Sequence, residues 1–220
     1  MKDVGGDRRR PRPRGYDAGF ALSYQRIEKI ARAIRARIAS DIRDDEALPG
    51  VQLFEKLDEL DVVIAGGRRV KLDWAVEELP GGVEGRTRYY EGEDKIVIEL
   101  SPSTYRGLLR GQRRARSTLF HEIAHAFLHT SLLIEMSQIP HIEKMALQRA
   151  FGPAHDHCRD SEWQADAVSA TLLMPARGLA VLEKEAHRLG GYQVQSRFRV
   201  SAESARIRIL TYEKRKSQLL

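Results

Sequence analysis

The 220-residue sequence has little cysteine and no long apolar run, and both absences narrow what the protein can be. Cys158 is the only cysteine, which excludes a disulfide within the chain and fits a reducing compartment, so we expect a cytoplasmic protein. No window approaches the roughly 18 apolar residues that a membrane span needs. The charged N-terminus is not followed by the apolar core of a signal peptide, so we expect neither export nor membrane association.

Positive charge is concentrated at the N-terminus. Six lysines and arginines against two aspartates give the first 14 residues a charge of +4, out of a net +6 for the whole chain. This stretch also contains Pro11 and Pro13 and cannot bury apolar area, so residues 1–16 are predicted to be a disordered basic tail. No aromatic residue alternates with the arginines for base stacking, which favours a solvated arm over one that binds nucleic acid.

The rest of the chain is predicted to form an α+β fold. Two strand-like runs, 86–90 and 95–100, are separated by a turn containing Gly92 and predict a hairpin in a small, mostly antiparallel sheet. Apolar residues at helical spacing, together with capping residues, predict helices at 24–38, 51–60, 117–133, 162–173, 179–189 and 202–210. We expect the sheet to pack against the helix at 117–133.

The predicted helix at 117–133 contains the sequence His-Glu-Ile-Ala-His. His121 and His125 are four residues apart, so their imidazoles project from one face of the helix and can bind one metal ion. Glu122 lies one residue further round, where its carboxylate can take a proton from a water molecule beside the ion. This pattern indicates hydrolysis of peptide bonds.

A second predicted helix strengthens this interpretation, because the motif alone is not specific. Glu162 and Asp166 are also four residues apart and share a face, so Glu162 is predicted to be the third ligand and Asp166 to hold the Nδ1–H of a ligand histidine. A glutamate in a first helical turn is otherwise explained by the helix dipole, and Asp166 could face solvent. Zn²⁺ is the expected metal, with Mn²⁺ as an alternative.

Other residues near the motif carry weaker signals. His129 lies one turn beyond His125 and is predicted to be a hydrogen-bonded residue of the helix face rather than a ligand. The segment from His155 to Cys158 lacks metal-ligand spacing and is predicted to be a mobile loop near the site. Tyr105, Tyr192 and His129 are equally eligible to stabilise a transition state.

Substrate binding is predicted only in outline. The strand at 95–100 precedes the histidine helix, and its edge could receive an extended substrate. A basic stretch lies between them and is predicted to be a solvated helix face in preference to a substrate-binding surface. It consists of Arg106, Arg110, Arg113, Arg114 and Arg116.

Two segments together resemble the ImmA/IrrE family of metallo-endopeptidases. They are RSTLFHEIAHAFLH at 116–129 and EWQADAVSATLLMP at 162–175, with weaker similarity at 198–209 and 27–35. The resemblance implies a zincin-like fold at 17–176 with a helical, helix-turn-helix-like segment at 177–220. It also implies that His121, His125 and Glu162 bind the metal and that Glu122 is the base.

The same resemblance implies a substrate, namely a helix-turn-helix transcriptional repressor whose cleavage releases stress or mobile-element genes. The long segment before Glu162 and the arginine-rich N-terminus depart from the family pattern. The alternative is a non-proteolytic DNA-binding or regulatory module, with residues 200–209 as a recognition helix and a structural metal. A closed structural site normally has four protein ligands, so three ligands beside a glutamate favour the enzyme.

Overall fold

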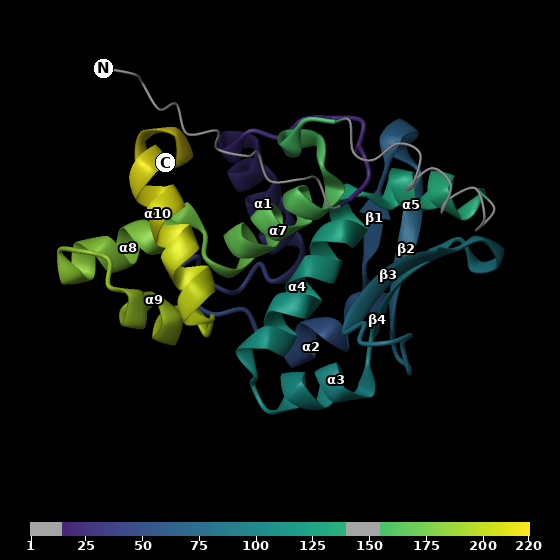
Figure 1. Cartoon of the computed structure of the whole chain (residues 1–220), viewed down its shortest axis with the longest axis horizontal. Coiled ribbons are helices and arrows are strands. Elements are labelled where there is room, and N and C mark those ends of the chain that lie inside the picture. The colour runs from purple at the N-terminus through teal and green to yellow at the C-terminus, as the bar shows by residue number, and fades with distance from the viewer. Residues whose placement is uncertain (1–14, 140–154) are drawn as a thin grey trace, which may run out of the picture.

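The computed structural model describes residues 15–139 and 155–220. One helix, α4 (Arg113–Leu128), runs through the middle of the molecule, with a four-stranded sheet on one side and a group of helices on the other (Figure 1). The predicted α+β class with a small sheet is therefore confirmed for the described residues. The histidine motif lies on this central helix.

The sheet contains β1 (Asp61–Val63), β2 (Arg69–Val76), β3 (Gly85–Tyr90) and β4 (Lys95–Leu100), in the order β1-β2-β4-β3. Only the β2–β4 pair is parallel, so the sheet is mostly antiparallel as predicted. β4 is paired on both sides, and the prediction that its edge receives a substrate is wrong. Its nearly continuous apolar sequence is that of an interior strand. The edge strand next to α4 is β3.

The predicted β3–β4 hairpin is present, and Gly92 lies in its turn as predicted. Asp94 has a φ of 48°, in the left-handed region, and Gly92 lies in the short 3₁₀ turn before it. Aspartate tolerates this conformation better than most residues. Its carboxylate accepts hydrogen bonds from Arg68 and from the Tyr89 hydroxyl, which fixes the turn against the sheet.

Helices form most of the remainder of the described chain. The helices predicted at 24–38 and 162–173 are found close to those bounds, whereas the one predicted at 51–60 ends at Phe54 and the one predicted at 202–210 continues to Leu219. The helices at 102–109 and 191–198 were not predicted. The predicted helix at 117–133 is two helices, because α4 ends at Leu128 and a second helix begins at Thr130. Arg199 and His187 take left-handed conformations after two of the C-terminal helices. The other helices are α1 (Tyr24–Ile38), α2 (Gly50–Phe54), α3 (Pro102–Leu109), α5 (Thr130–Ser137), α7 (Ser161–Leu173), α8 (Ala176–Ala186), α9 (Gly191–Phe198) and α10 (Ala202–Leu219).

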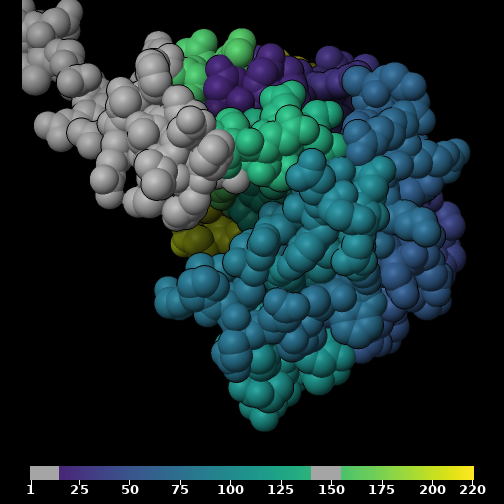
Figure 2. All heavy atoms as spheres, turned by 90° about the vertical axis from the view of Figure 1, so that its right-hand side faces the viewer, coloured from purple at the N-terminus to yellow at the C-terminus, as the bar shows by residue number. Residues whose placement is uncertain are grey.

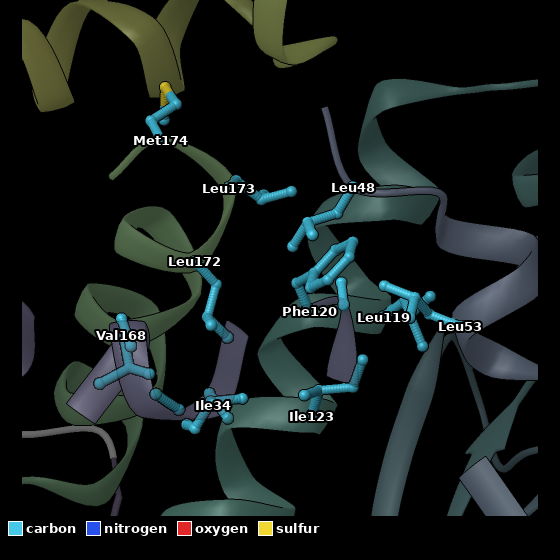
Figure 3. Close-up of a cluster of buried hydrophobic side chains, with 14 of the residues drawn as sticks. Ile34, Leu48, Leu53, Leu119, Phe120, Ile123, Val168, Leu172, Leu173 and Met174 are labelled. Carbon is cyan, nitrogen blue, oxygen red and sulfur yellow. The ribbon is translucent and has the colours of Figure 1, made fainter. Parts of the chain in front are cut away.

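The hydrophobic core surrounds α4. Phe120 and Ile123 of α4 are fully buried and belong to one cluster with Ile34 of α1 and with Val168 and Leu172 of α7 (Figure 3). Burying a side chain of this size contributes about 1.5–3 kcal/mol. The core therefore fixes α4 and α7 against each other, and these are the two helices that carry the predicted metal ligands.

The C-terminal helices belong to the same core. Val194 and Phe198 of α9 and Tyr212 of α10 are fully buried members of the cluster. Arg116 of α4, predicted to be solvated, is also buried, and its guanidinium donates hydrogen bonds to the carbonyl oxygens of Leu48, Phe198 and Arg199. That prediction is wrong for Arg116, whereas the other four arginines of the basic stretch are exposed. The predicted division at residues 176 and 177 stays a prediction.

The predicted tail lies mostly outside the described residues. Gly15 and Tyr16 are described, and their backbone N–H groups donate to the side chains of Asp160 and Ser161 at the start of α7. Seen from the side of the sheet, the blue and teal segment that carries the strands covers much of the surface, with α5 above it (Figure 2). Among the described residues no single helix has the length and apolar character for a membrane span, and only the bent α7–α8 pair meets that criterion jointly.

Candidate metal centre

Three of the predicted site residues meet between α4 and α7. His121 Nε2 lies 3.1 Å from His125 Nε2, and the two oxygens of Glu162 lie 3.3 Å from these two nitrogens. Ligand atoms about 2.0–2.1 Å from a tetrahedral zinc ion are about 3.3 Å from one another. The spacing of the three side chains therefore fits a shared zinc ion. They form the one such His/Cys/Asp/Glu group found among the described residues.

The local sequence explains why these groups converge. His121 and His125 occupy the same face of α4, one turn apart, and Glu162 lies in the first turn of α7, whose N-terminus is capped by the Asp160 side chain. The two helices pack closely through their buried apolar faces. The ligand positions are thus set by two rigid elements rather than by a loop.

Asp166 lies behind His121, as the spacing predicted. Its Oδ1 is 3.0 Å from His121 Nδ1, on the side of the ring away from Glu162. Burial disfavours the charged ring, but the bonds to Asp166 and Glu162 outweigh burial and raise the pKa of His121 to about 10. The hydrogen bond from His121 holds the pKa of Glu162 well below its usual value. The carboxylates of Glu162 and Asp166 make this cluster favourable for binding a cation.

A buried chain of hydrogen bonds orients the second histidine. The Gln164 amide nitrogen donates to the carbonyl oxygens of Phe20 and Cys158, at 2.8 and 2.9 Å, so its oxygen faces His129 Nε2 at 3.0 Å. His129 Nε2 must then carry the hydrogen. Burial, followed by the nearby His125, lowers the pKa of His129 to about 4 and keeps the ring neutral.

The tautomer of His125 follows from this chain. His129 Nδ1 lies 3.1 Å from His125 Nδ1, and because the neutral His129 carries its hydrogen on Nε2, its Nδ1 can only accept. His125 Nδ1 therefore donates, and the lone pair of its Nε2 points toward His121 and Glu162. The prediction that His129 is a hydrogen-bonded residue rather than a ligand agrees with this position.

Glu122 projects from α4 toward the sheet. It is buried, and its Oε2 accepts a hydrogen bond of 2.8 Å from the hydroxyl of Thr87 on β3. The same hydroxyl lies 3.1 Å from the Glu122 carbonyl oxygen. Thr87 and Gln164 were not singled out in the sequence. Thr87 belongs to no motif, and Gln164, although it lies within the segment at 162–175, contacts a residue 35 positions away.

The segment before α7 differs from the predicted mobile loop. His155 Nε2 lies 3.2 Å from Asp160 Oδ2, the His157 ring packs on Trp163, and the carbonyl oxygen of Cys158 accepts from Leu22 N. Residues 155–160 are thus fastened to the start of α7 and to the N-terminal segment. These three side chains do not join the metal-binding group.

The structure also shows the surroundings of the three residues considered for transition-state stabilisation, Tyr105, Tyr192 and His129. The Tyr105 hydroxyl donates to Glu55 at 2.6 Å, and both nitrogens of His129 are engaged by His125 and Gln164. Tyr192 is 83% exposed on α9. None of the three therefore stands out as the group that would contact a reacting carbonyl.

Comparison with known proteins supports the resemblance drawn from the motifs. Residues 110–210 match the model of the Peptidase_M78 family, described as the IrrE N-terminal-like domain, and this range contains both α4 and α7. The matched family is one of peptidases. No curated protein matches the sequence. A solved structure of a Mycobacterium tuberculosis transcriptional regulator is similar at 13% identity and a TM-score of 0.45, over 85% of this chain, which spans about half of that one (51%).

Proposed function

We propose, from the resemblance to IrrE-type peptidases and the geometry between α4 and α7, that this chain is a zinc-dependent endopeptidase of the cytoplasm. His121, His125 and Glu162 would hold the metal and Glu122 would be the general base. The observation that carries the proposal is the spacing of 3.1–3.3 Å among the three candidate ligand groups, with a buried carboxylate one residue from the first of them.

The residues around the metal have distinct parts in the proposed reaction. When bound, zinc would supply Lewis acidity, which makes water more acidic and polarises a carbonyl group. Glu122 would accept the proton of the attacking water at a carboxylate oxygen and pass it to the nitrogen of the leaving amine. The Thr87 hydroxyl would keep the carboxylate in place, and Asp166 and His129 would fix the two imidazoles.

Strand β3 offers the surface on which a peptide could lie. It is at the end of the sheet among the described residues, and Thr87 brings it within hydrogen-bonding distance of Glu122. An edge strand presents unpaired backbone groups that an extended peptide can pair with. We therefore place the substrate along β3, in contrast to the earlier expectation of β4.

The identity of the substrate is inferred from the family resemblance. We propose a helix-turn-helix transcriptional repressor, whose cleavage would derepress stress or mobile-element genes. Residues 17–176 would form the zincin-like peptidase unit and residues 177–220 a helix-turn-helix-like addition. Manganese is a second candidate for the metal, since a site with two histidines and a carboxylate can accept either ion.

A DNA-binding or regulatory module with a structural metal is the competing proposal. In that case the C-terminal helix α10 would enter a DNA groove. One face of α10 is occupied inside the protein, because Ala205, Arg208 and Tyr212 are buried. The two proposals differ in what Glu122 should do, since a structural metal site has no use for a base.

The decisive experiment uses a helix-turn-helix repressor as the substrate. We expect the zinc-loaded protein to cut it at defined positions, with fragments mapped by mass spectrometry, and a chelator to abolish cutting. Glu122→Gln should bind as much zinc as the unaltered protein and cut nothing. If Glu122→Gln changes neither cleavage nor the biological output, the enzyme proposal is wrong.

A further inference from the structure

Arginines without acidic partners gather at one place on the surface. Many arginines form an ion pair, as Arg114 does with Glu84 at 2.8 Å. Four others are exposed and form no ion pair with any residue that the structure describes, namely Arg106, Arg110, Arg113 and Arg199. We call these four residues the arginine patch. Their charges are not balanced within the described chain and can attract an anionic partner.

Three helices bring the arginine patch together. Arg106 and Arg110 are four residues apart at the end of α3, so their side chains share one face of it. Arg113 begins α4, and its guanidinium donates to the side-chain oxygen of Gln195 on α9 at 3.3 Å. Arg199 directly follows α9. The patch thus extends from the α3–α4 turn to the end of α9.

A buried arginine lies beneath the patch and adds to its charge. Arg116 is 5% exposed, and its guanidinium donates to three backbone carbonyl oxygens rather than to a carboxylate. Burial, and then the positive charge of Arg199, lower the pKa of Arg116. The two guanidinium groups therefore repel each other across a short distance. An anion bound at the patch would relieve this repulsion.

Exposed apolar and aromatic side chains accompany these charges. Leu109 is 55% exposed and lies three residues after Arg106, on the same face of α3. Tyr192 of α9 is 83% exposed and, together with Arg199, lines an open hollow of about 720 Å³. Tyrosine and arginine are enriched among the residues that dominate binding at protein interfaces. This composition indicates a binding surface for a protein partner.

The charges at the hollow favour a peptide over a nucleic acid. Five charged side chains form one ion-pair network there, namely Asp45, Glu46, Glu185, Arg43 and Arg197. Because acidic groups outnumber basic ones in this network, a phosphate chain laid across the hollow would be repelled. A peptide can instead place acidic side chains on the arginine patch and an apolar one against Pro49, which lines the hollow.

Strand β3 leads from the candidate metal centre toward the patch. Thr87 within β3 bonds to Glu122 beside the metal-binding group. Glu84, immediately before β3, pairs with Arg114, the neighbour of Arg113 in α4. A protein lying along β3 can therefore continue onto the arginine patch without leaving the surface.

We propose that the arginine patch and Tyr192 bind an acidic segment of the substrate protein, at a distance from the bond that is cut. The segment would offer aspartates or glutamates to the arginines and an apolar side chain to the hollow. The proposal deepens the proposed endopeptidase function and rests on it for the identity of the partner. Binding at the patch does not itself require an active metal centre.

Fluorescence anisotropy measures this binding without catalysis. The probe is a labelled peptide made of four repeats of Asp-Glu-Leu, titrated with the full-length protein. A peptide made of four repeats of Asn-Gln-Leu has the same length and no side-chain charge. It should bind about tenfold more weakly, because it offers the arginines no ionic partner. Binding of the acidic probe should also weaken as salt is raised, since exposed charges are screened.

Substitutions locate the binding site on the protein. Arg106→Gln with Arg110→Gln removes two charges from the patch and should raise the Kd of the acidic probe about five- to tenfold. Tyr192→Ala should raise it about fivefold. Arg26→Gln with Arg32→Gln is the matched control, because both arginines are exposed on α1 and form no described ion pair. It removes the same charge and should change the Kd by less than about twofold. All these side chains are exposed, so circular dichroism should be unchanged.

Cleavage shows whether the bound segment belongs to a substrate. The zinc-loaded protein is given a helix-turn-helix repressor, and the same repressor with the four Asp-Glu-Leu repeats attached at either terminus. We expect the attached repeats to lower KM about fivefold with kcat unchanged, because a second contact holds the substrate. In the protein with Arg106→Gln and Arg110→Gln the repeats should give no such gain.

The outcomes separate the two proposals. Equal binding of the acidic and amide peptides, or a Kd that Arg106→Gln with Arg110→Gln leaves unaltered, overturns the patch and retains the endopeptidase. Selective binding with a KM that the repeats leave unaltered overturns the substrate role of the patch. Selective binding with no cutting of the repressor supports the patch as an acidic-peptide site and overturns the endopeptidase. An oligonucleotide that binds more tightly than the acidic peptide, and loses this affinity in the same variant, assigns the patch to nucleic acid and overturns the proposal.

Discussion

The Thr87 hydroxyl on the edge strand donates a 2.8 Å hydrogen bond to the Glu122 carboxylate on the central helix. This contact joins the surface proposed for substrate binding to the proposed base. The carboxylate cannot rotate away without giving up a charge-assisted bond of the stronger kind. The sheet therefore contributes to the candidate site even though it supplies none of the metal ligands.

Thr87→Val should lower activity without loss of metal. A hydrogen bond to a charged group contributes about 1.5–3 kcal/mol, which corresponds to about a 10- to 100-fold fall in kcat. Thr87→Ser should restore most of the rate because it keeps the hydroxyl. The measurement is steady-state cleavage together with zinc content. Equal activity of the valine and threonine proteins would show that the contact has no part in orienting Glu122.

Gln164→Glu should weaken zinc binding from a distance. The new carboxylate would favour a protonated His129, with a hydrogen on both ring nitrogens. The Nδ1–H of His129 would then face the Nδ1–H of His125, which disfavours the His125 tautomer whose Nε2 is free to bind zinc. Loss of such an outer contact typically costs about 10- to 100-fold in metal affinity. Competition with a chelator measures this. Gln52→Glu, an exposed change in α2, is the control and should leave affinity as it was.

Zinc binding near neutral pH should release about one proton. The pKa of His121 is raised to about 10 by Asp166 and Glu162 despite burial, so the metal-free protein holds this proton up to that pH, and a metal must displace it. Because the pKa of His121 is raised on folding, the proton on this ring stabilises the folded, metal-free protein. This stabilisation is complete below the pKa of the unfolded chain, 6.5, and is lost as the pH rises through about 10. Calorimetry in buffers of different ionisation enthalpy counts the protons, and a count of zero contradicts the assignment.

Gly85→Ala should separate β3 from α4. A Cβ at this position would lie 2.7 Å from Thr118 Cγ2 and 3.0 Å from Glu122 Cγ, so the strand has to shift. Overpacking of this kind costs about 1–3 kcal/mol of stability and should also reduce activity, because Thr87 moves with the strand. Gly92→Ala is the control, since its Cβ would meet no atom within 4 Å. Thermal unfolding and cleavage assays distinguish the two.

Arg116→Met should destabilise the whole molecule. The buried guanidinium satisfies the carbonyl oxygens of Leu48, Phe198 and Arg199, and its loss leaves these groups without their donor. We expect a cost of about 2–4 kcal/mol in the free energy of unfolding, measured with urea. Arg114→Met removes an exposed arginine two residues away that pairs with Glu84 and should cost less than about 1 kcal/mol.

Features that depend on neighbours in the sequence were predictable. The bounds of α1 follow from its apolar spacing, and α10 begins at the predicted residue, with Ser201 as its N-cap. His121, His125, Glu162 and Asp166 could be proposed as one group because two helical spacings of four residues define two matching faces. The family resemblance rests on the same residues.

Features that depend on distant partners were not predictable. The run at 117–133 contains no glycine or proline, yet the helix breaks at His129, where the side chain reaches Gln164 on α7. In the sequence Arg116 is one of five arginines in a basic stretch, but the carbonyl groups that it bonds to lie 68 or more residues away. Thr87 likewise carries no local sign of its bond to Glu122. In each case tertiary contacts decide a position that local pattern leaves undetermined.

The bonds from Gly15 and Tyr16 to Asp160 and Ser161 have a mechanical consequence. Asp160 caps α7, and Glu162 follows within the first turn, so the beginning of the described chain acts as a clasp on the residue proposed to bind the ion. A chain shortened to start at Ala18 would lose that clasp. In that shortened chain the first turn of α7, which carries Glu162, should open before the rest of the protein unfolds. Metal bound at the proposed site would then be lost before global unfolding.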